Sequence, residues 1–347
     1  MTLLFSEANG NFAKISTQAE GNRNRISVKG LNQIVGPGYL SPALTFTRAQ
    51  AANVQASAVN FLNTGLDFFA ANTPRFAGPS RRLLNEDTAV NLINGMAAPS
   101  TQNIAVSAGN HVLTFYGTGS ITLSGAATGT LTGTGAGNRV ALPFTATTGT
   151  LTLTVSGTVT RAQLETGGYA SSYVEASSGA ATRGADNISG SLSSFGIGTN
   201  GACTVLFRGL CPVNFSLLTE GQLACISDGG FLNFARLVIT GVGGGGQLVL
   251  ANRTAGVDTI TVLAGGARPT GSLFSCGVSF HGTGRVTGVW NGSSVGAALG
   301  APASGYTTFD LFHLRGILPL VCEAQKVDLL PFSLSDTELQ TAVSTFL

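Results

Sequence analysis

Apolar residues alternate with threonine or serine between residues 100 and 165, and this pattern constrains the fold more than any other feature of the sequence. The alternating apolar positions are Leu113, Phe115, Ile121, Leu123, Leu151, Leu153 and Val155. Successive side chains of a β-strand point to opposite faces, so each such strand has one apolar and one polar face. Glycines separate the runs and mark turns. The segment therefore predicts a small antiparallel β-sandwich of half-buried strands.

The rest of the chain has the composition of an all-β protein. It contains 48 glycines among 347 residues, 43% hydrophobic residues and only 10% charged residues. A chain this apolar should fold, and β-branched residues with frequent glycines favour short strands joined by tight turns. Runs such as residues 203–207 and 259–263 indicate that strands continue through the last third of the chain.

One short helix is expected near the C-terminal end. Ser335 and Glu338 have the spacing of a capping box, in which each side chain hydrogen-bonds to the backbone of the other residue. Leu339, Val343 and Leu347 follow at helical spacing, which places them on one face.

The chain is long enough for two or three domains, and its composition changes along five segments. These are a polar N-terminal arm (1–40), an opening module of strands and loops (41–95), the small sandwich (96–175), a linker of small residues (176–195) and a C-terminal domain (196–347). The four glycines at 243–246 predict a hairpin or loop. They do not resemble a phosphate-binding loop, because no Lys-Ser/Thr pair follows them.

Charge and hydropathy argue against several kinds of partner. The net charge is +2 without a basic cluster, so the footprint of a nucleic-acid-binding protein is missing. No stretch approaches the roughly 20 apolar residues that span a bilayer, and the N-terminus lacks the regions of a secretory signal peptide. Neutral strands with threonine faces need covered edges, so we expect copies of the chain to assemble.

The five cysteines all lie in the last part of the chain. They are Cys203, Cys211, Cys225, Cys276 and Cys322. An odd number without a CxxC pair fits neither a disulfide framework nor a zinc site. We expect reduced thiols that pack as small apolar side chains. A single disulfide is the alternative that the sequence leaves open.

No catalytic constellation is recognisable in the sequence. The 16 acidic residues are scattered apart from the neighbours Glu86 and Asp87, whereas a glycoside hydrolase needs a carboxylate pair around its substrate. The histidines, His111, His281 and His313, are far apart and accompany no nucleophile motif. We therefore predict a non-enzymatic protein with no catalytic residue, cofactor or metal.

Four residues are candidates for contacting a glycan, because aromatic rings stack on sugar faces. They are Trp290, Asn291, Tyr306 and His281. Trp290 is the one tryptophan and precedes Asn291-Gly292, which is a type I′ hairpin signal. Tyr306 is similarly placed, and His281 lies beside a predicted turn. The alternative for each of them is packing in the interior of the protein.

The first half of the chain carries short motifs in a fixed order. They are Phe46-Thr-Arg48, Pro74-Arg-Phe76, Arg82-Leu-Leu-Asn-Glu86, Asn91-Leu92, Leu113-Thr-Phe-Tyr-Gly-Thr-Gly119, Leu123-Ser-Gly-Ala-Ala-Thr-Gly129, Arg161-Ala-Gln-Leu-Glu-Thr-Gly167, Ser171-Ser-Tyr173 and Ala181-Thr-Arg183. In this order they resemble a family of tailed-phage virion proteins described as head spike or fibre-domain proteins. The first motifs are similar to the opening module of that family, and the later ones to its sandwich.

The C-terminal third resembles a different module. Val278-Ser-Phe280, Gly284-Arg-Val286 and Asn291-Gly292 are similar to the penultimate hairpin of a concanavalin A-like, laminin-G-type jelly roll. Leu334-Ser-Asp-Thr-Glu-Leu339 is similar to the segment that ends such modules. The two resemblances together cover roughly residues 44–345. Such jelly rolls often bind calcium through clustered acids, and the sequence has no such cluster.

These resemblances imply a structural virion protein that projects from a phage particle as a spike, fibre or decoration. They imply repeated copies, which we expect to be a homotrimer, and an N-terminal arm that docks on capsid, portal or tail proteins. They also imply contact with host-surface polysaccharide, and location in the virion without a signal peptide. The alternative is a tail-associated glycan-degrading enzyme. A cellular adhesin is disfavoured, because adhesins are usually exported by a signal peptide.

Overall fold

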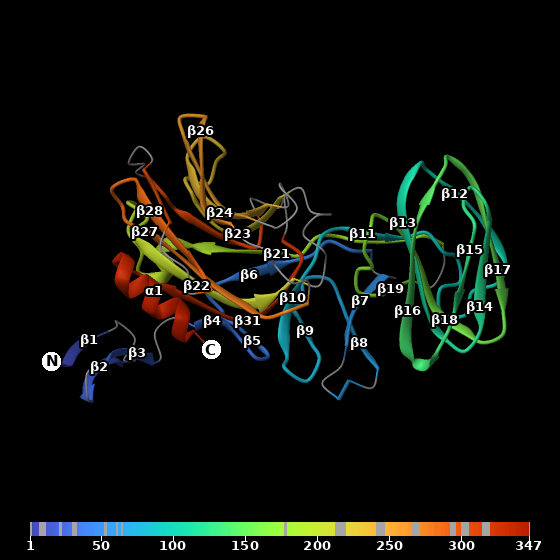
Figure 1. Cartoon of the computed structure of the whole chain (residues 1–347), viewed down its shortest axis with the longest axis horizontal. Coiled ribbons are helices and arrows are strands. Elements are labelled where there is room, and N and C mark those ends of the chain that lie inside the picture. Colours follow the sequence, from blue (N-terminus) through green and yellow to red (C-terminus); the bar gives the residue numbers. More distant parts are fainter. Residues whose placement is uncertain are drawn as a thin grey trace. The chain divides into compact units, whose positions relative to one another are not determined.

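A computed structural model of the chain describes residues 2–6, 12–20, 23–29, 33–51, 54–59, 62–63, 65–176, 179–211, 220–240, 247–265, 271–291, 296–299, 305–313 and 320–346. The described residues form antiparallel strands, one 3-10 turn and one α-helix (Figure 1), which confirms the predicted all-β fold class. None of the described helices is long and apolar enough to cross a membrane.

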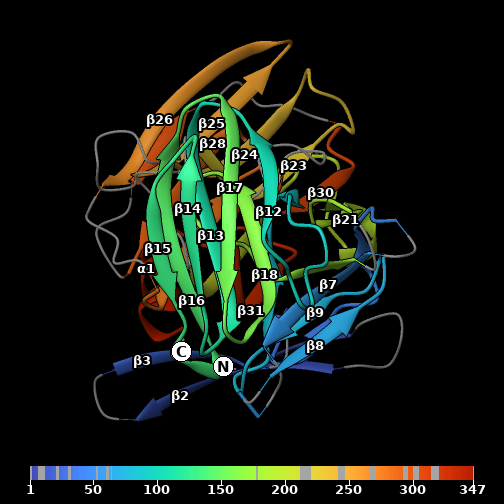
Figure 2. The same ribbon diagram turned by 90° about the vertical axis from the view of Figure 1, so that its right-hand side faces the viewer.

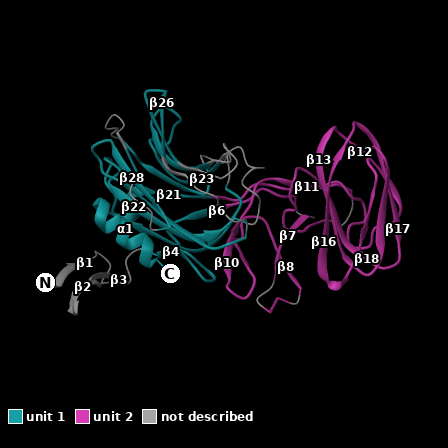
Figure 3. Cartoon of the chain, in the orientation of Figure 1, with its two compact units in different colours: residues 1–45, 188–347 teal, residues 46–187 magenta. Residues whose placement is uncertain are grey.

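The chain divides into two compact units (Figure 3). Unit 2 consists of residues 46–187, and unit 1 consists of residues 1–45 and 188–347. The strands at the two crossings between the units are β6 (Thr45–Thr47) and β21 (Asn187–Ser191). The five predicted segments stay a prediction, but residues 176–195, predicted to be a linker, contain β21 and two further elements. These are β20 (Ala181–Arg183) and the 3-10 turn η1 (Leu192–Phe195).

Unit 2 contains the small antiparallel sandwich that the period of two predicts (Figure 2). One sheet has the order β12 (Gln102–Val106), β17 (Gly149–Ser156), β14 (Ser120–Gly125), β15 (Gly129–Thr132). The other has the order β16 (Gly135–Ala146), β13 (Gly109–Gly117), β18 (Val159–Thr166). Apolar residues of both sheets form one core. Leu151 and Leu153 of β17 are buried there, while Thr150 and Thr154 beside them are exposed.

Strand β13 departs from the simple alternation. Thr114 lies between the buried residues Leu113 and Phe115, and it is itself buried. Its hydroxyl accepts a hydrogen bond from the Arg139 guanidinium at 2.8 Å, and Arg139 also donates to the Ser171 carbonyl at 2.6 Å. Because the Thr114 hydroxyl has a charged hydrogen-bond donor, it can be buried without being left unpaired, and side chains on both faces of this strand can be buried.

The remaining strands of unit 2 are short and pair in three small groups. They are β19 (Val174–Ala176) with β7 (Val54–Val59) and β8 (Leu66–Phe69), β11 (Ala89–Asn91) with β20, and β9 (Arg75–Ala77) with β10 (Arg82–Asn85).

A buried ion-pair network connects these groups. Asp186 accepts from Arg48 at 3.2 Å and from Arg75 at 2.6 Å, and all three side chains are fully buried. Glu86 lies 2.9 Å from Arg75 and 3.4 Å from Arg183. Burial alone would raise the pKa of Glu86, but the charges of Arg183 and Arg75, with hydrogen bonds from Ser172, lower it to about 2. The network is therefore charged at neutral pH.

Unit 1 contains a second and larger antiparallel sandwich, as predicted for the C-terminal part of the chain. Its first sheet has the order β29 (Gly296–Leu299), β28 (Arg285–Trp290), β27 (Phe274–Phe280), β22 (Cys203–Leu210), β31 (Cys322–Leu330), with β4 (Gln33–Gly36) beside β31 and β5 (Tyr39–Leu40) beside β4. The second has the order β26 (Val257–Gly265), β25 (Gln247–Thr254), β24 (Phe234–Thr240), β23 (Glu220–Ser227), β30 (Thr308–Leu311), β21. Phe207 of β22 meets Phe312, which follows β30, edge to face at 5.8 Å, so the two sheets share a core.

The predicted terminal helix is confirmed as α1 (Asp336–Thr345). Ser335 and Glu338 form both bonds of the capping box. Leu339 and Val343 are buried against Leu206 of β22 and Val289 of β28, so the helix covers the outer face of the first sheet. Leu347 lies outside the described residues.

All five cysteines are buried in unit 1, as predicted for cysteines that pack as small apolar side chains. The predicted glycine loop at 243–246 lies outside the described residues.

The N-terminal segment forms strands. β1 (Thr2–Ser6), β2 (Phe12–Glu20) and β3 (Arg23–Lys29) make a three-stranded antiparallel sheet. Within the predicted arm, Ile34 and Val35 are buried, and Val35 pairs with Val327 of β31. The docking role of the arm stays a prediction.

Candidate functional site

A recess opens at one end of the unit 1 sandwich, between its two sheets. Its floor includes Ile226, Ala235 and Asn252, which are neighbours across β23, β24 and β25. Phe280 and Val286, a paired position of β27 and β28, contribute the first sheet. The recess contains about 260 Å³ of atom-free space, open solvent at its mouth included. Because open solvent makes up much of this volume, the recess is shallow and admits only the tip of a ligand.

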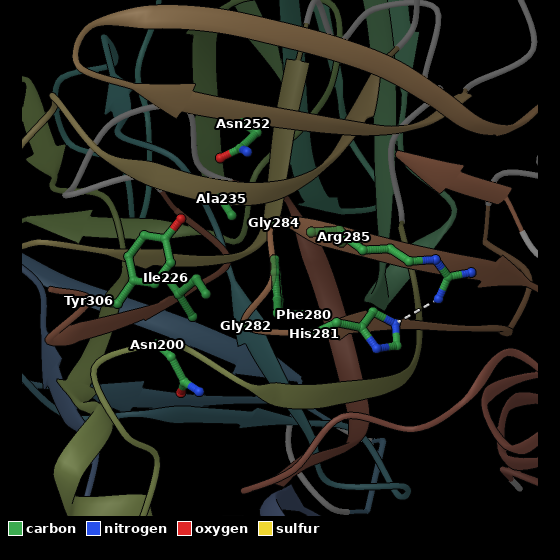
Figure 4. A pocket seen from close by; sticks show the side chains of 11 residues that line it. Asn200, Ile226, Ala235, Asn252, Phe280, His281, Gly282, Gly284, Arg285 and Tyr306 are labelled. Carbon is green, nitrogen blue, oxygen red and sulfur yellow. Dashed lines mark hydrogen bonds between the residues drawn. The ribbon is translucent and has the colours of Figure 1, made fainter. Parts of the chain in front are cut away.

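Two glycine-containing loops form the rim (Figure 4). In the first, Asn200 uses its side-chain oxygen to accept from the Ala202 N–H. Gly201 has a φ of 69°, and a Cβ there would lie 2.5 Å from the Tyr306 ring. The second loop runs from His281 to Gly284 and is closed by a 3.0 Å bond from the His281 N–H to the Arg285 carbonyl. Close approach of the first loop to Tyr306 thus requires glycine.

Asn252 is the unusual residue of the recess. It is only 5% exposed, yet its side-chain oxygen has no hydrogen-bond partner among the described residues. Leu250, two residues earlier on β25, and Ala235, its partner across β24, are both apolar and buried. A buried carbonyl oxygen without a donor costs about 1–3 kcal/mol. The other cross-strand partner of Asn252 is the exposed Thr259 of β26. Because the Asn252 oxygen has almost no accessible surface, it is a cost within the floor of the recess.

The neutral His281 and the ion-paired Arg285 form the polar side of the recess. One Arg285 nitrogen lies 3.2 Å from His281 Nε2, and the other contacts both oxygens of Asp336 at 2.8 and 2.6 Å. Because a guanidinium only donates, His281 Nε2 must accept, and the proton of the neutral ring lies on Nδ1. Burial, followed by the charge of Arg285, lowers the pKa of His281 against an opposing effect of Asp336. The ring is therefore neutral at neutral pH.

Tyr306 forms the wall opposite Arg285 in Figure 4. Its backbone N–H donates to Thr199 at 3.0 Å, which fixes it to the first rim loop. The residue is 6% exposed, and burial raises the pKa of its phenol to about 12. An almost covered ring cannot act as an open stacking platform, so its contribution is shape and a hydroxyl.

The structure brings together two of the four predicted glycan-contact residues. His281 and Tyr306 both line the recess. Trp290 ends β28 four residues beyond Val286, which corresponds to about 13 Å along a strand, and Asn291 follows it. Trp290 stacks on Phe274 at 4.4 Å. The Asn291 side-chain oxygen accepts from the Ser275 N–H at 2.9 Å. Sugar contact by any of the four stays a prediction.

Asn252, Asn200 and Arg285 were not among the residues predicted from the sequence. A signal for Asn252 exists, because it shares the parity of the buried Leu250 and so lies on the same face of the strand. The arrangement offers neutral hydrogen-bonding groups in a shallow, mostly apolar recess. Among the described residues, no group of three or more His, Cys, Asp or Glu side chains is arranged to hold a metal ion.

Neither a scan against protein-family models nor a search of curated proteins finds a match. Solved structures give low similarities. A leech intramolecular trans-sialidase complexed with 2,7-anhydro-Neu5Ac has 13% identity and a TM-score of 0.34, over 42% of this chain and 23% of that one. The Ruminococcus gnavus IT-sialidase CBM40 bound to α2,3-sialyllactose has 13% identity and a TM-score of 0.33, over 41% and 82%. Domain 4 of an extracellular arabinanase from Geobacillus stearothermophilus, in complex with arabinotriose, has 13% identity and a TM-score of 0.35, over 46% and 73%.

The chain thus spans under a quarter of the length of the leech enzyme. TM-scores this far below 0.5 say nothing about the function of this chain.

Proposed function

We propose that this chain is a structural, non-enzymatic component of a tailed-phage virion that binds a host-surface glycan through the recess of unit 1. The observation that carries the binding role is the recess itself, which combines apolar residues with the hydrogen-bonding side chains of Asn200, His281 and Tyr306. Sugars present hydroxyl groups and apolar ring faces that match such a lining, and a small recess suits the tip of a flexible polysaccharide.

The virion role rests on the order of short motifs that resemble spike and fibre-domain proteins. The low charge of the chain supports it, because a chain with only 10% charged residues suits a protein assembled with copies of itself. A shallow site binds weakly, but repeated copies on one particle, in a homotrimer or higher array, convert weak contacts into strong attachment. The N-terminal arm would dock each copy on capsid, portal or tail proteins.

A glycan array with the full chain tests the binding role. We expect binding to a limited set of oligosaccharides and no cleavage products when the bound sugars are recovered and weighed by mass spectrometry. Cleavage would favour the alternative, a tail-associated glycan-degrading enzyme. The particle role is tested by immunogold labelling of intact phage with antibodies against the chain. Label on the particle surface is expected, and absence of the chain from purified particles would contradict this role.

A further inference from the structure

An open sheet edge lies along β26, the last strand of the second sheet of unit 1 (Figure 1). Among the described residues, β26 pairs with β25 on one side and with no strand on the other. The strand β29, which ends the first sheet on the same side of the sandwich, is not paired with β26 either. Such an edge presents a row of backbone N–H and C=O groups on which another β-strand can pair.

The sequence of β26 does little to protect this edge. Proteins guard exposed edges with proline, lysine or other charged side chains, and with bulges. The strand contains no proline, lysine or arginine, and its one acid, Asp258, lies near its beginning. A register irregularity follows Val262 and leaves the segment before it regular. A neutral edge that alternates apolar residues with threonine is a template for pairing with another chain.

A buried apolar cluster on one face of the sheet continues to this edge. Val238 of β24 and two residues of β25, Val249 and Ala251, form the cluster. Val262 is the cross-strand partner of Val249. Ile260 is the partner of Ala251, so both residues of β26 lie on the face of the cluster. They end the apolar row, and they are 67% (Ile260) and 53% (Val262) exposed.

We propose that β26 is a contact surface for a second copy of this chain, with the two β26 strands paired antiparallel about a two-fold axis at Thr261. This register places Ile260 of each copy opposite Val262 of the other, and the two Thr261 residues opposite each other. These positions precede the irregularity, and no ionisable residue takes part in them. The apolar row then runs unbroken from the sheet of one copy into that of the other.

The strand favours its own copy over an unrelated partner, because the two-fold axis supplies the matching alternation by symmetry. A two-fold contact joins copies in pairs, so a trimer built through another surface would be linked to a second trimer. The inference goes beyond the proposed function and holds whatever the recess binds. No described residue of β26 lines the recess, so the glycan array remains an independent test of the binding role.

Light scattering of the full chain tests the contact. The wild-type protein should contain an even number of chains. Val262→Lys places a charge opposite Ile260 at both symmetry-related positions and should halve the mass at the same concentration. Val59→Lys, at an exposed position of β7 in unit 2, is the matched control and should leave the mass unchanged. A monomeric wild-type chain, an odd number of chains, or a mass that survives Val262→Lys would overturn the proposal.

A cross-link gives a second readout that a destabilised fold would not mimic. All five native cysteines are buried, so an introduced cysteine at the edge is the thiol expected to react. Thr261→Cys should form a covalent dimer under mild oxidation, because the two Thr261 positions face each other across the axis. Thr259→Cys, on the same face, is the control. Its two thiols would lie four residues apart, about 14 Å, which is too far for a disulfide. Cross-linking of the control that equals or exceeds that of Thr261→Cys would overturn the proposed pairing.

Discussion

Buried ion pairs connect the strands of unit 2, and Asp186 is the residue of this network that is most sensitive to substitution. Its carboxylate lies between the guanidinium groups of Arg48 and Arg75, and all three side chains are fully buried. Pairs of this kind contribute little net stability relative to apolar residues, but loss of one partner leaves a buried charge uncompensated. Asp186 therefore matters more as a counter-charge than as a source of stability.

Asp186→Asn should destabilise unit 2 by about 3–5 kcal/mol, because two buried guanidinium groups lose their shared carboxylate. Chemical denaturation followed by hydrogen exchange of unit 2 amides measures the change. Asp67→Asn, at an exposed position of β8, is the control and should shift stability by less than about 0.5 kcal/mol. Equal effects of the two substitutions would show that the network does not contribute as described.

The sequence could not predict this network. Glu86 and Asp186 are separated from each other by 100 residues, and a pairing over that distance depends on how the short strands of unit 2 assemble. The same limit applies to Asn252, whose burial depends on the partner sheet. Sugar contact by Trp290 also stays a prediction, and the stacking of its ring on Phe274 again depends on a contact between separate strands.

At the scale of elements, local signals predicted structure well. The period of two in residues 100–165 gave the strands of the small sandwich, and the capping box gave α1, because neither depends on distant residues. The burial of Ala181 and Arg183 in β20 was not predictable from the small residues that surround them in the sequence. Arg183 is buried because it pairs with Glu86, which lies elsewhere in unit 2.

Ser335→Ala should lower the stability of unit 1 by about 0.5–2 kcal/mol, because the backbone N–H of Glu338 loses its acceptor. Urea denaturation followed by the fluorescence of Trp290, the single tryptophan, reports on this unit directly. Ser344→Ala, in the last turn of the same helix, removes a hydroxyl that only donates to Thr341 and is the control. A loss as large in the control as in Ser335→Ala would argue against capping as the cause.

At the scale of the whole molecule, the two units should respond differently to acid. In unit 1, His313 is buried with Nε2 within 2.9 Å of the Ile188 backbone, and burial lowers its pKa from 6.5 to about 4. The unfolded chain therefore binds a proton between these values that the folded unit does not. In unit 2, the pKa of Glu86 is lowered from 4.5 to about 2, so its contribution is lost only below pH 4.5.

Unit 1 should accordingly lose up to about 3 kcal/mol through His313 as the pH falls from 6.5 to 4, at about 1.4 kcal/mol for each pH unit. Urea denaturation at several pH values, read from Trp290 fluorescence, measures this. The His313→Gln variant has no titrating group at this position, so its free energy of unfolding should depend less steeply on pH. Because other groups, such as the buried Asp328, titrate equally in both proteins, the difference isolates His313. Identical pH profiles would refute the assignment.

The central claim is that the recess of unit 1 binds a glycan, and a crystal structure with the tightest-binding oligosaccharide of the array tests it most directly. We predict a sugar in the recess between Tyr306 and His281, with the Arg285–Asp336 pair intact. A sugar bound at Trp290 and Asn291, or anywhere else with the recess unchanged, would contradict the account.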